Sequence, residues 1–177
     1  MASPKRDKIV LMRPLQWNDS YSIFLPEIDA EHRNLFRLAN DLHAALLSNA
    51  PEARLQEALQ AFVADIEDHF SHEERLMRST GYGSYLWHKR QHDGVRQRTK
   101  QALEQFAAGD REALSALLEH FAGWLRDHTG LTDRMLGAYL RNYERRPIVA
   151  APAQRFTARK NARPAPSCPA MPRAPAS

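Results

Sequence analysis

Apolar residues recur every three or four positions from residue 27 to residue 143, which is the spacing of one face of an α-helix. The alternation of apolar and polar positions that is typical of a half-buried strand is absent from this stretch. The pattern falls into four segments, at about 27–48, 51–79, 84–108 and 110–143. Because the connections between these amphipathic segments are short, we expect an all-α protein, an antiparallel up-down-up-down four-helix bundle.

Acidic residues and glycines mark the ends and weak points of the predicted helices. Asp29 is expected to cap the first helix, and Gly81 is expected to begin the loop that ends the second. Gly123, Gly130 and Gly137 lie inside the fourth helix. Each costs up to about 1 kcal/mol relative to alanine, so we expect local bends there.

Two further segments flank the predicted bundle of residues 27–143. Residues 1–26 contain several aromatic and aliphatic side chains, and we expect them to form an arm that packs on the bundle. Residues 144–177 hold seven of the 11 prolines and no glycine, and they lack apolar periodicity. We therefore expect this second segment to be a disordered, basic, Pro/Ala-rich tail.

The distribution of charge removes one function class. The formal net charge of the chain is +4, which would ordinarily suggest a nucleic acid or an anionic membrane as partner. However, residues 1–143 hold 18 basic and 20 acidic residues, whereas residues 144–177 hold seven basic residues and one acidic residue. The positive charge thus belongs to the tail, and we expect no nucleic-acid partner for the bundle, although a protein partner for the tail stays possible.

Other classes are excluded by what the chain lacks. No apolar run approaches the roughly 18–20 residues needed to span a bilayer. The N-terminus has no apolar stretch followed by the small-residue cleavage site of a secretory signal, so we expect a cytoplasmic protein. Cys168 is the lone cysteine, which excludes a thiolate metal cage and an intrachain disulfide.

Histidines carry the candidate chemistry, and two helical pairs have the spacing of metal ligands. His69 precedes Glu73 by four residues, and His88 precedes His92 by four. Four residues at about 100° each place both members of a pair on one face of a helix. Both members of a pair can therefore coordinate one metal ion, or one member can coordinate a neighbouring ion.

The other candidates come from the first and fourth segments. His32 lies in the first, and His128 and Asp133 lie in the fourth, five residues apart. Five residues correspond to about 140° on an ideal helix, which is the weakest spacing of the set unless Gly130 permits a local distortion. Imidazole nitrogen and carboxylate oxygen without thiolate suit iron, manganese or zinc. Because these five histidines and two acids exceed the needs of one ion, two ions bridged by the carboxylates are the simpler interpretation.

Competing motifs are absent. His72 and Glu73 begin an HExxH-like run, but the second histidine of a zinc protease is missing. No histidine has a glutamate three residues before it, as the carboxylate-rich di-iron bundles require. Glycine-rich phosphate loops and the GxSxG nucleophile elbow do not occur either.

At these residues the chain resembles the hemerythrin-like family, specifically the bacterial single-domain hemerythrins. The resemblance begins at Trp17 and continues to about Asp133, roughly two thirds of the chain. The stretches that carry it are IleAspAlaGluHisArgAsnLeuPhe (28–36), HisPheSerHisGluGluArgLeuMet (69–77), His88-x-x-x-His92 and TrpLeuArgAspHis (124–128).

The resemblance implies a centre of two irons bridged by two carboxylates and a hydroxo or oxo group. The first iron would be bound by His88, His92 and His128, the second by His32 and His69, and the bridges would be Glu73 and Asp133. The iron with only two histidines would keep an open coordination position, where O₂ would bind.

An apolar wall around that position would keep out water, which would otherwise release the oxygen in reduced form. Candidates near the ligands by helical spacing are Leu35, Phe70, Trp124 and Leu125. Two residues depart from the family pattern. Thr129 replaces a commonly aliphatic residue of the pocket, so that a hydroxyl there would bond O₂ or admit water, and Glu31 replaces a usual glutamine and is interpreted as a surface change.

The leading hypothesis is therefore a non-haem di-iron protein that reversibly binds O₂ for oxygen storage, delivery or sensing, and that is not an enzyme. One alternative is a di-iron enzyme that reduces peroxide or oxidises a small substrate, but no second acid/base set converges on the site. Another alternative is a regulatory module that acts through its tail. His43, His72 and His120 lie outside the ligand pattern and are interpreted as ordinary surface or core residues.

Overall fold

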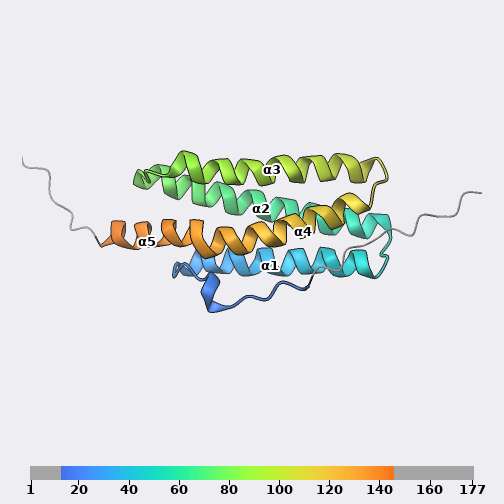
Figure 1. The fold of residues 1–177 in the computed structure, drawn as a ribbon, viewed down its shortest axis with the longest axis horizontal. Helices are drawn as coiled ribbons and strands as arrows, with labels where there is room; N and C mark the ends of the chain where they lie inside the picture. The colour runs from blue at the N-terminus through green and yellow to red at the C-terminus, as the bar shows by residue number, and fades with distance from the viewer. Residues whose placement is uncertain (1–12, 146–177) are drawn as a thin grey trace, which may run out of the picture. The chain divides into compact units, whose positions relative to one another are not determined.

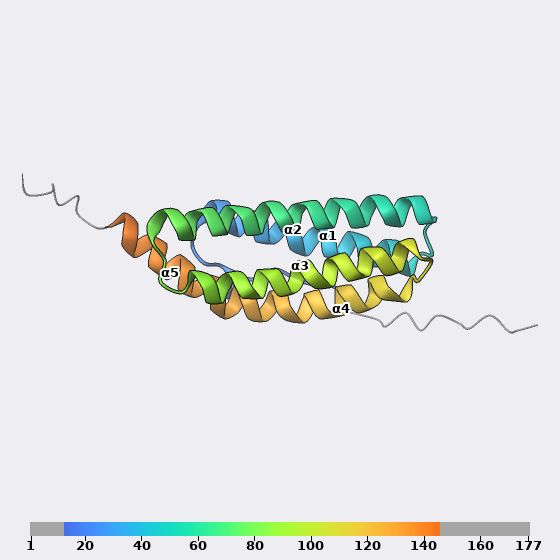
Figure 2. The same cartoon turned by 90° about the horizontal axis from the view of Figure 1, so that it is seen from above.

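The computed structural model describes residues 13–145, and within this range the chain forms helices and turns without a strand. The long helices are α1 (Pro26–Leu47), α2 (Glu52–Thr80), α3 (Tyr85–Ala107) and a fourth run made of α4 (Glu112–Asp127), η2 (His128–Thr132) and α5 (Asp133–Glu144). Consecutive helices run in opposite directions, and α4 returns to lie beside α1 (Figures 1 and 2). The predicted four-helix bundle is confirmed.

Some of the sequence predictions fall on residues that the structure does not describe. Residues 1–12 of the predicted arm, residues 146–177 of the predicted tail and Cys168 all lie outside the described range. Within residues 13–145, no helix is both long enough and apolar enough to cross a lipid bilayer.

Among the described residues, the hydrophobic core consists of two clusters. The larger includes Phe62 and Phe121, whose rings meet edge to face at 4.8 Å, and it extends to Phe70 on α2 and Leu125 on α4. The smaller contains Met77, Tyr82, Leu136 and Leu140. On α2, Phe70 belongs to the larger cluster and Met77 to the smaller, so Glu73 lies between residues of the two clusters.

A glycine ends α2 and fixes the turn into α3. Gly81 has φ +70, and its N–H donates to the carbonyl of Arg78. The next N–H, of Tyr82, donates to the carbonyl of Met77 at 2.9 Å. This is the Schellman arrangement, in which a left-handed residue satisfies the last carbonyls of a helix, and it brings Tyr82 into contact with the smaller cluster.

The described part of the arm is tied to α1 by hydrogen bonds. Asn40 accepts from the N–H of Leu15 at 2.8 Å and donates to its carbonyl at 2.9 Å. The prediction that Asp29 caps α1 was wrong, because the helix already begins at Pro26 and the N–H of Asp29 bonds to the carbonyl of Leu25. The Asp29 carboxylate instead accepts from the N–H of Ile23 at 2.8 Å and so holds the arm against the helix.

Candidate metal centre

The structure brings all seven candidate ligands into one place inside the bundle. Each of them is at most 2% exposed. Three helices and the η2–α5 junction supply them: His32 from α1, His69 and Glu73 from α2, His88 and His92 from α3, His128 from η2 and Asp133 from α5.

The seven residues form two overlapping groups, within each of which the donor atoms lie within 4.8 Å of one another. The first group holds three histidines and two acids, and the second holds two histidines and the same two acids. Their members are Glu73, His88, His92, His128 and Asp133 in the first, and His32, His69, Glu73 and Asp133 in the second. The two carboxylates are thus shared, which is the arrangement required of bridges between two cations.

Asp133 directs its two oxygens toward different groups. Its Oδ1 lies 3.0 Å from Nε2 of His128 and 3.1 Å from Nε2 of His88. Its Oδ2 lies 3.2 Å from Nε2 of His32. Glu73 contacts the first group through Oε2, which lies 3.3 Å from Nε2 of His88, and the same oxygen lies 3.9 Å from Nε2 of His69.

The junction between α4 and α5 explains why His128 and Asp133 meet although they are five residues apart. Residues His128–Thr132 form a π-helical segment, and the N–H of Asp133 donates to the carbonyl of His128. The i→i+5 bonding of a π-segment holds one more residue per closed ring than an α-helix does, so position i+5 comes near position i. The distortion expected at Gly130 is present in this form, and it places both side chains at the centre.

Several polar atoms of the centre lack hydrogen-bond partners among the described residues. Both oxygens of Glu73 and of Asp133 are buried without a donor in hydrogen-bonding geometry, and so are both ring nitrogens of His32. The Nε2 atoms of His88 and His128 face each other at 3.1 Å. Buried carboxylates and facing nitrogen lone pairs are costly unless a cation lies among them, so the donor set fits a metal centre.

The pKa values of the candidate ligands also indicate a site for a cation. Burial by itself would raise the pKa of Asp133, but the surrounding imidazoles outweigh burial and hold this pKa well below its usual range. Burial would lower the pKa of His88, but Asp133 and Glu73 raise it to about 9. The site therefore stabilises positive charge, which protons supply when no metal is bound.

Glu31 was interpreted from the sequence as a surface change, and the structure corrects this. Its Oε2 accepts from Nδ1 of His69 at 2.9 Å, and its Oε1 accepts from Nδ1 of His72 at 2.6 Å. Burial would raise the pKa of Glu31, but these two hydrogen bonds lower it overall. Glu31 thereby orients His69. Its position directly before His32 is the one feature of the sequence that could have drawn attention to it, but this position does not reveal the contact with His69.

Two other outer contacts were also missed from the sequence. Nδ1 of His92 lies 3.3 Å from Oε1 of Glu74, and Nδ1 of His128 lies 3.1 Å from Oε1 of Gln91. An acceptor at Nδ1 keeps the hydrogen there and leaves Nε2 free to face the centre. Both acceptors neighbour candidate ligands in sequence, but their partners lie on other helices.

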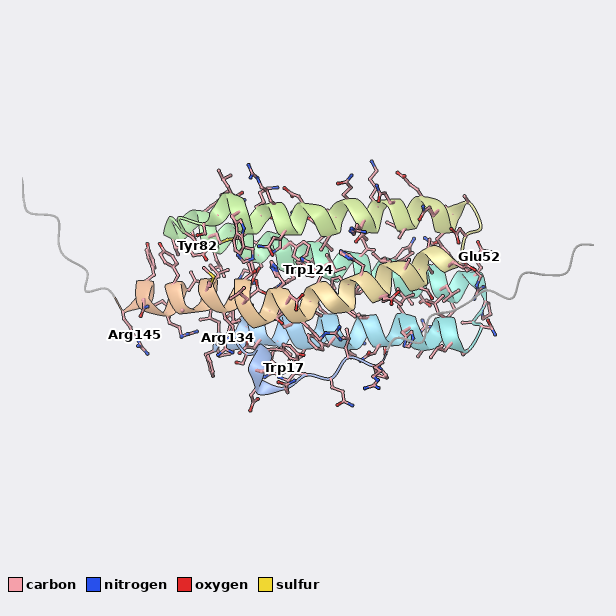
Figure 3. All side chains as sticks on the ribbon, in the orientation of Figure 1. Trp17, Glu52, Tyr82, Trp124, Arg134 and Arg145 are labelled. Atoms are coloured by element: carbon pink, nitrogen blue, oxygen red, sulfur yellow. The ribbon has the colours of Figure 1, made fainter. Side chains whose placement is uncertain are left out.

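Two of the predicted pocket residues, Phe70 and Trp124, contact ligand rings of the centre. Leu35, Phe70, Leu125 and Thr129 are buried, and the ring of Phe70 stacks on His92 with centroids 3.9 Å apart. Trp124, which is partly buried, stacks on His128 at 4.2 Å. Figure 3 shows Trp124 within the bundle and Trp17 on the outer side of α1, where its ring lies 6.3 Å from that of His32.

The histidines outside the pattern differ from one another. His72 is partly exposed and bonds Glu31, as described above. His43 is buried, its Nε2 has no partner among the described residues, and burial lowers its pKa. His120 is half-buried and lines a small cavity of about 110 Å³ with Arg98, away from the centre.

Comparison with known proteins decides the family. The sequence pattern described as Hemerythrin HHE cation binding domain matches residues 24–140, which include all seven candidate ligands. The chain belongs to the hemerythrin family. A cation-binding domain agrees with the buried, shared carboxylates and the inward-facing imidazoles of this hemerythrin chain.

Individual hemerythrins cover much of the same region. The bacteriohemerythrin of Aquifex aeolicus (strain VF5) is 30% identical over 126 residues, which are 70% of this chain and 93% of that protein. The bacteriohemerythrin of Ralstonia nicotianae is 27% identical over 129 residues, 73% of this chain and 90% of its own. The myohemerythrin of Theromyzon tessulatum is 37% identical over 79 residues, 45% of this chain and 60% of its own.

Proposed function

We propose that this chain binds two irons between its helices and binds O₂ reversibly there, in oxygen storage, delivery or sensing. The observation that carries the proposal is the pair of buried donor groups that share Glu73 and Asp133. One group offers five donor residues and the other four, so the second ion would keep more room for an outside ligand. The similarity to bacteriohemerythrins and a myohemerythrin favours iron as the metal and O₂ as the ligand.

Different residues would have different roles in binding the two irons. Glu73 and Asp133 would bridge the ions, and five imidazoles would complete the two coordination spheres through Nε2. Bound iron would supply an open coordination position and the electrons that O₂ takes up on binding. The acceptors at Nδ1 of His69, His92 and His128 hold these rings in the orientation that the centre requires.

The apolar wall supports reversible binding over turnover. Phe70 and Leu125 are buried, and the rings of Phe70 and Trp124 stack on those of His92 and His128. A dry pocket limits the supply of water and protons, which would convert bound oxygen into a released reduced product. Side chains that exclude water therefore favour return of O₂ unchanged.

The test is anaerobic loading with Fe²⁺, followed by metal analysis and absorption spectra before and after O₂ is added and then removed. We expect two irons per chain and an absorption band that appears with O₂ and disappears when O₂ is withdrawn. Asp133→Ala should lose the band and iron, whereas Asp127→Ala, which alters an exposed acid of the same helical run, should keep both.

The same preparation tests the alternative of an enzyme. Rapid, repeated turnover of hydrogen peroxide by the loaded protein, without a reversible band, would replace the carrier function by a peroxidase function. A centre that takes up zinc or manganese in preference to Fe²⁺ would contradict the proposal at its first step.

A further inference from the structure

Arg96 lies one helical turn after His92 on α3 and joins this helix to α2. Its Nε and Nη2 donate to the two oxygens of Glu67, at 2.7 and 3.0 Å. Its Nη1 donates to Oε1 of Glu74 at 2.7 Å and to Oδ1 of Asp93 at 3.1 Å. A planar guanidinium can serve several carboxylates at once because its donors are fixed in a fork.

Glu74 transmits this contact to the centre. It is 6% exposed, and the oxygen that accepts from Arg96 is also the one that lies 3.3 Å from Nδ1 of His92. A buried carboxylate without a cation is costly, and the guanidinium of Arg96, at 2.7 Å, is a closer partner of Glu74 than that of Arg78, at 3.8 Å. A carboxylate acceptor at Nδ1 in turn favours the hydrogen there and leaves the lone pair of Nε2 for the centre.

A second contact links Arg96 to the same ring. Its guanidinium carbon lies 5.3 Å from the centroid of the Phe70 ring. That ring stacks on His92 with an interplanar angle of 4°. Arg96 therefore acts on the position of His92 both through a hydrogen-bonded carboxylate and through a stacked aromatic ring.

We propose that Arg96 is a positioning residue of the metal centre, which fixes the tautomer and the ring orientation of His92 through Glu74 and Phe70. The consequence for metal binding rests on the proposed function, whereas the tautomer is a property of the chain itself. The two parts are therefore tested by separate measurements.

The first measurement is ¹⁵N NMR of the histidine side chains in the metal-free full-length protein. Oε2 of Glu73 lies 3.3 Å from Nε2 of His92 and competes for the ring hydrogen in the metal-free chain. The parent should therefore show a larger fraction of His92 with its hydrogen on Nδ1 than Arg96→Gln does. Arg98→Gln is the matched control, because Arg98 is an exposed arginine on the same helix. An Arg96→Gln spectrum that matches the parent at His92 would overturn the proposal, whatever metal the protein binds.

The second measurement is the rate at which zinc-loaded protein loses its metal to a chelator. Loss of an outer-sphere partner typically lowers metal affinity 10–100-fold, so Arg96→Gln should release zinc faster by about that factor. Glu74→Gln should release zinc at a similarly increased rate. Arg96→Lys should release zinc more slowly than Arg96→Gln, because a lysine keeps the positive charge but lacks the several fixed donors of a guanidinium. If the parent binds no zinc and no iron, the proposed function fails while the tautomer result still stands.

Glu67→Gln distinguishes a role of Arg96 in positioning His92 from a role in merely linking α2 to α3. It weakens the paired contact with Arg96 and leaves Glu74 and Phe70 in place. We expect its zinc release within about threefold of the parent, well short of the typical outer-sphere effect. If Glu67→Gln released zinc as fast as Arg96→Gln, Arg96 would act only by holding the helices together, and the proposal would be wrong.

Discussion

Thr129 shows how a single side chain can differ in role from what its type suggests. It is fully buried, and its hydroxyl donates to the carbonyl of Leu125 at 2.7 Å, one helical turn earlier. The hydroxyl hydrogen is thus engaged within the helix and does not extend toward the centre. The oxygen atom still adds a polar group beside His128, and polar groups favour entry of water into a cavity.

We expect Thr129→Val, which removes the hydroxyl at nearly equal size, to slow autoxidation of the iron-loaded protein. Thr129→Ile should slow it at least as much, because it also fills the pocket. The measurement is the decay of the oxygenated absorption band in air. Equal decay rates in the parent and both variants would show that the hydroxyl has no influence on the pocket.

Glu31 is the other residue whose role depends on its surroundings. One carboxylate accepts hydrogen bonds from two imidazoles, and the single carbonyl of a glutamine cannot replace both oxygens. We expect Glu31→Gln to weaken metal binding about tenfold, at the lower end of typical outer-sphere effects. Chelator competition measures this, with Glu27→Gln, an exposed acid one turn earlier on α1, as control. Equal affinities for the two variants would contradict the prediction.

These residues also show which parts of the site could be predicted from the sequence and which could not. The pairs His69–Glu73 and His88–His92 were predictable because the period of the helix alone places them on one face. Glu31 and His69 are 38 positions apart, and their contact depends on how α1 packs on α2. A hydrogen bond of this kind has no local periodicity, so the sequence did not distinguish Glu31 from an exposed glutamate.

At the scale of elements, the π-helical segment is the feature that completes the centre. On an ideal helix the side chains of His128 and Asp133 would point in different directions, so the sequence predicted a distortion between them, at Gly130. It did not indicate which distortion would occur. The N–H of Asp133 bonds to the carbonyl of His128, so α5 continues with its register shifted by one residue relative to α4.

The glycines of this helical run should respond differently to substitution. A Cβ at Gly137 would lie 2.7 Å from the carbonyl oxygen and 2.9 Å from the Cβ of Ile23, whereas a Cβ at Gly123 would meet nothing within 4 Å. We expect Gly137→Ala to destabilise the fold by about 1–3 kcal/mol, the usual cost of overpacking, because the arm must shift. Gly123→Ala should stabilise it by up to about 1 kcal/mol.

Denaturant unfolding of both variants measures these changes. A Gly137→Ala variant as stable as Gly123→Ala would mean that the arm yields to the new methyl group without cost. That outcome would contradict the close packing of α5 against residue 23.

At the scale of the molecule, the bundle was predictable because apolar spacing and short connections allow few other arrangements. The contacts of the arm were less predictable, since they depend on tertiary hydrogen bonds such as that between Asp29 and Ile23. The bundle as a whole also sets how stability responds to pH, because it buries five imidazoles and two carboxylates together.

In the metal-free chain, burial would lower the pKa of His88, but Asp133 and Glu73 raise it to about 9, above its ordinary 6.5. The stability that this group contributes is complete below pH 6.5 and is lost as the pH rises toward 9. Burial also opposes the shift at His69, but Glu73 and Glu31 raise its pKa in the same direction. Burial lowers the pKa of His92, His43 and His120. These three groups change the stability below about pH 6.5, so between pH 6.5 and pH 9 the raised pKa values of His88 and His69 set its direction.

Metal removal should therefore reverse the pH dependence of stability. Bound metal requires neutral imidazoles, so metal affinity rises with pH over the range in which the metal-free chain loses stability. We expect the difference in Tm between metal-loaded and metal-free protein to widen from pH 6.5 to pH 9. In metal-free His88→Gln the decline of Tm over this range should be shallower. A difference in Tm that stays constant or narrows would show that the buried histidines do not bind protons in place of metal.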